Sequence, residues 1–156
     1  MVEDENEDEI LTRALGGVGA AGGAVGGGAG GFLGGLLGGR VGALLTKKVS
    51  QEAEVTLPLP LGAAAERVRD VLAEMRQPLV SDLLSPMTDQ TKIMAIAGGG
   101  FGNLNPVVIT IRLTAHGRRS TALEIRTAAK EGIIRQRSAE KAMKRLVSLL
   151  GTPDIR

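Results

Sequence analysis

The residue types that carry out chemistry are scarce in this chain. Its 156 residues include no cysteine and one histidine, His116. Without cysteine there is no thiolate nucleophile, no disulfide and no Cys-ligated metal centre. A Ser-His-Asp triad would have to use His116, which stands beside two arginines in an expected hairpin turn and is more simply an exposed side chain. The sequence therefore identifies no reaction, and we expect neither an enzyme nor a bound metal.

The neighbours Lys130 and Glu131 are a further pair that could exchange a proton. Consecutive residues on a strand or at a helix edge point in different directions and are usually solvated, so we expect no acid–base chemistry from them. Two GxGxxG matches lie among the glycines near the N-terminus. They lack the preceding strand and the later acidic residue of a dinucleotide site, so no cofactor is expected either.

The loop over residues 98–106 combines glycines, an apolar tip and two side-chain amides. Such a loop could cradle an anion or touch a membrane. The competing interpretation is a long hairpin connection whose phenylalanine folds back onto the core. The candidate binding residues of this loop are Gly99, Phe101, Asn103 and Asn105.

The last expected helix has a basic face, which is a candidate for contact with anionic lipid headgroups. Each charge close to such a surface contributes about 1 kcal/mol. An ordinary solvated helix face is the alternative. The residues concerned are Arg135, Lys141, Lys144 and Arg145.

A block of glycines is the most unusual feature of the sequence. Fifteen of the 23 glycines fall between residues 16 and 42, and no charged residue occurs from 14 to 39. That length, at about 1.5 Å per helical residue, exceeds the ~30 Å hydrocarbon core of a bilayer. Glycines four apart lie over one another on a helix, so they form a flank on which another backbone can pack closely. The two rows are Gly19, Gly23, Gly27, Gly31, Gly35 and Gly39, and Gly22, Gly26, Gly30, Gly34, Gly38 and Gly42.

This pattern resembles the glycine-zipper segments of bacterial membrane and envelope proteins. The resemblance covers residues 16–42 and implies membrane association and close self-packing, but no chemistry. If the segment spans a membrane, the flanking basic residues place the later part of the chain in the cytoplasm. A soluble packing segment or a low-complexity linker, with a cytoplasmic location, is the alternative.

Charge is unevenly distributed. The first nine residues carry six carboxylates, whereas 17 Lys and Arg accompany 11 Asp and Glu from residue 43 onward. An acidic start is unlike a secretory or transit peptide. The later excess of basic residues is modest. Phe32 and Phe101 are the two aromatic residues, so the chain has almost no aromatic side chains on which nucleic-acid bases could stack. We expect no nucleic-acid partner.

The part of the chain after residue 52 shows strand and helix patterns. Residues 55–61 alternate with period two, and their prolines confine them to a sheet edge or to a non-donating register. Residues 62–76 have helical spacing, residues 79–84 are expected to form a turn, and strands are expected over 92–97, 106–115 and 120–128. A long helix is expected over about 131–150, ended by Gly151. The helix stripes are Ala65, Val68, Leu72 and Met75, and Ala139, Met143, Leu146 and Leu150.

This order predicts an α+β two-layer sandwich (β-α-β-β-β-α), with an antiparallel sheet covered by a long C-terminal helix. Arg112 and Glu124 are expected to pair across two of its strands. The domain resembles helix-grip or TATA-binding-protein-like domains, on the element order over residues 53–151 and on the run 129–136 that enters the last helix. Larger helix-grip proteins hold lipophilic ligands between sheet and helix, so the resemblance implies such a site.

The expected organisation is an acidic disordered tail (1–13), a glycine-zipper helical segment (14–45), a hinge (46–52), the α+β domain (53–151) and a tail (152–156). Our leading hypothesis is a non-enzymatic, membrane-associated protein that self-associates through the zipper and presents a small interaction domain. Its partners would be membrane lipid and further copies of itself. The alternative is a soluble or peripheral module that binds a lipid or another apolar small molecule.

Overall fold

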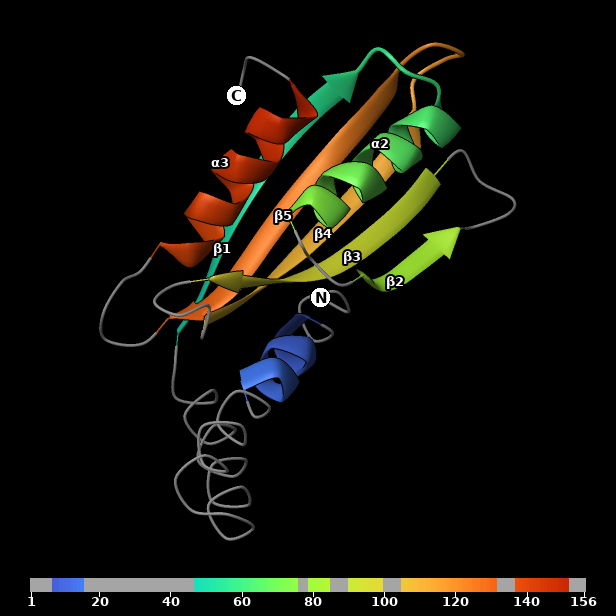
Figure 1. Ribbon diagram of the computed structural model, residues 1–156. Coiled ribbons are helices and arrows are strands. Elements are labelled where there is room, and N and C mark those ends of the chain that lie inside the picture. The colour runs from blue at the N-terminus through green and yellow to red at the C-terminus, as the bar shows by residue number, and fades with distance from the viewer. Residues whose placement is uncertain are drawn as a thin grey trace, which may run out of the picture.

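The computed structural model describes residues 7–15, 47–75, 79–84, 90–99, 105–131 and 137–151. A helix over residues 7–15 comes first, and a sheet with two further helices follows (Figure 1). The expected α+β class is confirmed. The elements after the first helix are β1 (Lys47–Leu57), α2 (Leu61–Glu74), β2 (Leu79–Leu84), β3 (Gln90–Gly99), β4 (Asn105–Ala115), β5 (Thr121–Glu131) and α3 (Ser138–Leu150).

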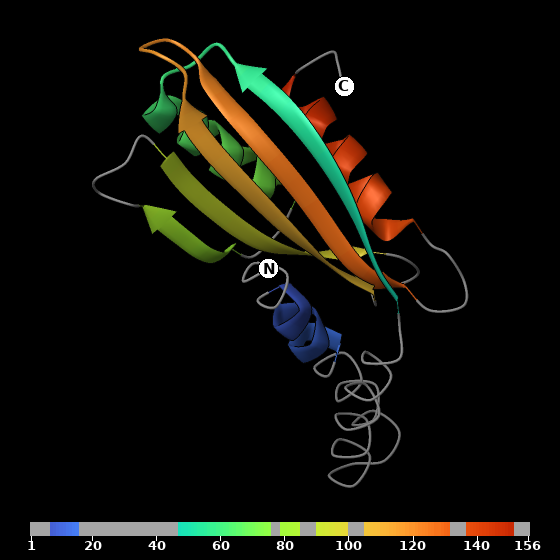
Figure 2. The same ribbon diagram turned by 180° about the vertical axis from the view of Figure 1, so that it is seen from behind.

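The five strands form one antiparallel sheet in the order β1-β5-β4-β3-β2. Helices α2 and α3 lie side by side on one face, which we call the helical face (Figure 1). The opposite face, called the outer face, is seen in Figure 2, with the helix over 7–15 near the end of the sheet where β1 begins. The arrangement is of the helix-grip type, with a sheet packed against a C-terminal helix.

Side chains alternate between the two faces of the sheet along each strand, and those on the helical face form the main core. In β4, the expected stripe of Val107, Ile109, Ile111 and Leu113 is completely buried. The opposite residue Arg112 is exposed and pairs with β5 as expected, with Nη1 3.9 Å from Oε2 of Glu124.

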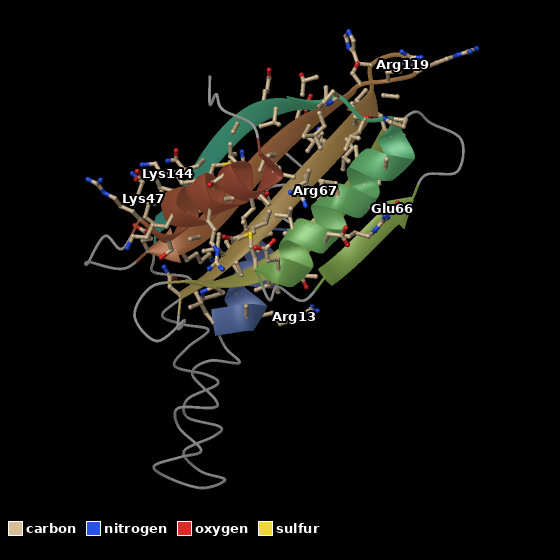
Figure 3. The ribbon with its side chains drawn as sticks, turned by 45° about the horizontal axis from the view of Figure 1, so that its top comes forward. Arg13, Lys47, Glu66, Arg67, Arg119 and Lys144 are labelled. Carbon is tan, nitrogen blue, oxygen red and sulfur yellow. The ribbon has the colours of Figure 1, made fainter. Side chains whose placement is uncertain are left out.

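Both helices bury the stripes that their spacing predicts. The first stripe, three residues of α2 and Met75 directly after it, and the four stripe residues of α3 are all buried. Glycine ends α3 as expected, since Gly151 has a φ of 77° that other residues adopt at a cost. Arg67 lies between the two helices (Figure 3), and its guanidinium donates a hydrogen bond to the Leu149 carbonyl at 2.7 Å. This contact joins the helices at one end.

Several boundaries differ from the expectation. Residues 47–52, expected as a hinge, are part of β1, because pairing with β5 extends the strand to Lys47. Residues 79–84, expected as a turn, form the edge strand β2. Helix α3 begins at Ser138 rather than near Glu131, which ends β5. The prolines at 58 and 60 follow β1, and β1 is an edge strand as predicted.

The N-terminal expectation also needs correction. Residues 7–13, expected to be part of a disordered tail, are helical. Both glycine rows lie outside the described residues, so the zipper stays a prediction. Among the helices that the structure does describe, none combines the length and apolar character that crossing a bilayer requires.

Candidate functional site

The helical face of the sheet changes in character along the strands. One row across the sheet consists of Ile93, Ile111 and Ile125. The next two rows toward the start of β4 contain Ile109 and Val107. An alanine lies beside Ile109, and alanines lie on both sides of Val107. We call these three residues, Ala95, Ala97 and Ala129, the alanine floor. All three are buried, with at most 2% of their surface exposed.

Alanine side chains reach less far above the sheet than isoleucine side chains do. Each alanine carries about three carbons fewer than an isoleucine at the same place. The floor lies in the second half of β3, beside the first half of β4 and the end of β5. Figure 1 shows the ends of β3 and β5 near the start of α3. Met75 follows α2 and Met143 is in α3, and both are buried in the same core cluster as the alanines. Methionine is unbranched and flexible, so this part of the core can repack around a guest more easily than the isoleucine row.

Polar groups tie the start of α3 to this end of the sheet. Glu131 is 6% exposed, and its Oε1 accepts the backbone N–H of Ser138 at 2.8 Å. Asn105 donates through Nδ2 to the Ser138 hydroxyl at 3.0 Å, and Thr127 donates to the Ala139 carbonyl at 2.9 Å. The carboxylate is well placed, because helix N-termini favour negative charge. An apolar floor and a small polar cluster therefore lie at the same end of the sheet–helix layer.

The structure places part of the loop that the sequence singles out. Gly99 ends β3 and pairs with Asn105, which begins β4. The Asn105 amide donates a hydrogen bond to Ser138, so it holds the start of α3 at this end of the sheet. Phe101 and Asn103 lie outside the described residues, and their role stays a prediction.

Lys130 and Glu131 point in different directions, as their adjacency predicts. Glu131 bonds to Ser138 at the start of α3, whereas the Lys130 ammonium lies 2.9 Å from the Asp8 carboxylate on the outer face. The expectation that both are solvated is wrong, since they are 5% and 6% exposed. The helix over 7–15 covers Lys130 on the outer face, and α3 covers Glu131 on the helical face.

The basic face of α3 is exposed. Lys141, Lys144 and Arg145 all lie on the solvent side of the helix, with Lys144 labelled in Figure 3, while Arg135 lies outside the described residues. Lys144 donates to Glu140 at 2.8 Å, and this hydrogen bond and charge hold the pKa of the Glu140 carboxyl below its usual range. The arrangement is that of a solvated helix face with an i,i+4 ion pair.

His116 occupies the β4–β5 turn and is exposed, as expected. Its backbone N–H bonds to the Ser120 carbonyl at 2.8 Å, which closes the turn. In the part of the chain that the structure describes, no three acidic or histidine side chains gather as a metal site.

Local periodicity does not reveal the alanine floor. The expected stripe in β4 consists of Val, Ile and Leu, and the neighbours of Val107 in β3 and β5 are alanines. The signal for the floor is therefore the register in which the three strands pair.

No protein-family model matches the chain, and no curated protein matches it. Among solved structures, the crystal structure of Ara h 8.0201 is 13% identical with a TM-score of 0.43, and the match covers 67% of this chain and 97% of that one.

Two further solved structures are similar to a comparable degree. Norcoclaurine synthase from Thalictrum flavum, in complex with dopamine and hydroxybenzaldehyde, is 11% identical with a TM-score of 0.42, covering 70% of this chain and 88% of that one. A START superfamily protein from Mycobacterium smegmatis is 12% identical with a TM-score of 0.36, covering 66% and 93%. Likeness at this level concerns the arrangement of the elements alone.

Proposed function

We propose that this chain binds an apolar small molecule between the helical face and the two helices, above the alanine floor. The observation that carries the proposal is the floor itself. Three buried alanines occupy adjoining rows of a sheet whose other central row is isoleucine. Ligand sites are mostly apolar, with a few convergent polar groups, and this end of the layer has both.

The geometry also indicates the kind of ligand. Aliphatic side chains and the methionines Met75 and Met143 belong to the same core cluster as the floor, so we propose a ligand whose body is apolar. The Glu131 carboxylate accepts hydrogen bonds, so a ligand with a donating end, such as a hydroxyl or an amine, would be oriented toward the start of α3. The proposed activity is binding without chemical conversion.

The membrane-associated, self-associating protein is the leading hypothesis of the sequence, and its zipper lies outside the described residues. The two functions are compatible, because a binding domain can be presented by an anchor. The site proposed here does not depend on the anchor.

Binding of the fluorescent apolar probe N-phenyl-1-naphthylamine to the full chain tests the proposal. We expect a saturable rise in probe fluorescence for the unmodified protein. Ala95→Leu fills the floor with about three extra carbons and should weaken probe binding at least tenfold. Met143→Ala enlarges the same space and should leave binding intact or strengthen it, although it costs about 2–5 kcal/mol of stability.

The matched control is Ala122→Leu, the same substitution on the outer side of β5, where Ala122 is half-buried and pairs with Thr114. It should leave probe binding unchanged. Far-UV circular dichroism and thermal unfolding establish that each variant is folded. Equal probe binding by the Ala95→Leu protein and the unmodified chain, or no saturable binding at all, would contradict the proposal.

A further inference from the structure

The outer face of the sheet holds a buried carboxylate in a basic socket. Glu7, in the N-terminal helix, is 2% exposed. Its Oε2 lies 3.1 Å from Nε of Arg126 and 3.2 Å from Nζ of Lys48, and its Oε1 accepts a hydrogen bond from the Thr110 hydroxyl at 3.3 Å. These partners come from β5, β1 and β4, so a single side chain of the helix engages three strands.

A second polar contact lies beside the first. The Lys130 ammonium is 2.9 Å from Oδ1 of Asp8 and donates to the Thr12 hydroxyl at 3.0 Å. The side chain of Lys130 is 4% exposed. Two consecutive acidic residues of the helix therefore meet three basic residues of the sheet.

Apolar contacts complete the interface. Leu11 is completely buried and forms a cluster with Met94, Val108 and Ala128 of the outer face. Leu11 comes one helical turn after Glu7, so both side chains are on the face of the helix that meets the sheet. By contrast, Glu9 is on the exposed side, where its side chain is 67% exposed and pairs with Arg13.

We infer that this part of the outer face is a binding site for an acidic amphipathic helix, and that residues 7–15 are its resident, exchangeable occupant. The site recognises two adjacent carboxylates followed one turn later by leucine. It is separate from the proposed ligand site, because it lies on the other face of the sheet.

The resident helix is exchangeable because it depends on the sheet to stay folded. A nine-residue helix is marginal in water on its own, and one fully buried leucine contributes only about 2 kcal/mol. The 31 residues 16–46 join it covalently to β1, so its docking is an intramolecular event. The same helix of a second copy of the chain competes for the same socket.

Thiol protection in the full chain tests the inference, since the native protein has no cysteine. Met94→Cys places one thiol under the helix. We expect Glu7→Lys, which sets a cation against Lys48 and Arg126, to raise the rate of thiol modification at least tenfold. Glu9→Lys is the matched control, on the same helix but exposed, and should leave the rate unchanged.

Addition of a peptide of residues 1–15 tests whether a separate copy of the helix binds to the same site. It should restore protection to the Glu7→Lys protein in a saturable, salt-sensitive manner, whereas the peptide with Glu7→Lys should not. An unaltered modification rate in the Glu7→Lys protein would overturn the inference. Protection restored by phosphatidylserine vesicles and not by the peptide would also overturn it, because the face would then bind lipid.

A second measurement covers the case in which Met94→Cys fails to fold. Hydrogen exchange of the amides of residues 7–15, in chains without cysteine, should become at least tenfold faster with Glu7→Lys and stay unchanged with Glu9→Lys. Equal exchange in the two variants would contradict the inference.

Discussion

Glu131 should hold α3 in place through one charge-assisted hydrogen bond. The residue before the helix, Arg137, makes no side-chain cap, so Glu131 supplies the described side-chain acceptor for the first turn. Bonds to a charged group contribute about 1.5–3 kcal/mol and neutral ones about 0.5–1.5 kcal/mol. Glu131→Gln keeps an acceptor and loses the charge, so we expect it to lower the free energy of unfolding by about 1 kcal/mol.

Glu131→Ala should cost more. It removes the acceptor and leaves a buried N–H unsatisfied, which adds about 1–3 kcal/mol, so the total is about 2–4 kcal/mol. Urea denaturation followed by circular dichroism measures both variants. Glu124→Ala, on the exposed side of the same strand, is the control and should change stability by less than about 1 kcal/mol. If Glu131→Gln and Glu131→Ala were both as stable as the unmodified chain, the capping role would be refuted.

Three further predictions concern α3. Leu146→Ala should lower the free energy of unfolding by about 2–5 kcal/mol, because Leu146 is fully buried. Leu149→Ala, at a half-buried position, should lower it by less, and urea denaturation measures both variants. Lys144→Ala should raise the pKa of Glu140, measured by NMR titration. Because that pKa is lowered in the folded state, the pair stabilises the protein above the ordinary carboxyl pKa and stops doing so as the pH falls through the lowered value. Gly151→Ala should cost about 1 kcal/mol in thermal unfolding, from backbone strain at φ 77° alone, since a Cβ there meets nothing within 4 Å.

The part of the fold that the sequence predicts is the part set by local periodicity. Buried stripes in α2, α3 and β4 follow from spacing, and the Arg112 to Glu124 pair follows from the short turn between β4 and β5. These features need no knowledge of distant residues.

The features that escaped prediction depend on distant partners. Residues 47–52 are polar and become a strand through pairing with β5, more than 70 residues away. The acidic residues 7–9 have the composition of a solvated tail. They become helical because Glu7 finds Arg126 and Lys48 on the sheet, a contact that sequence spacing does not show.

The candidate site was predictable in outline only. Element order predicts a layer between sheet and helix, and the buried stripes show which residues line it. The alanine floor depends on the register of three strands, and the buried state of Glu131 depends on where α3 starts. Both features depend on contacts between residues that are far apart in the sequence.

Methyl NMR of the methionines gives the most direct test of the proposed binding function. Met75 and Met143 lie in the core of the helical face, and Met94 lies on the outer face, so one titration has its own internal control. Adding N-phenyl-1-naphthylamine to the full chain should shift the Met75 and Met143 methyl signals saturably and leave Met94 unchanged. A shift confined to Met94, or no saturable shift at Met75 and Met143, would contradict a ligand site above the alanine floor.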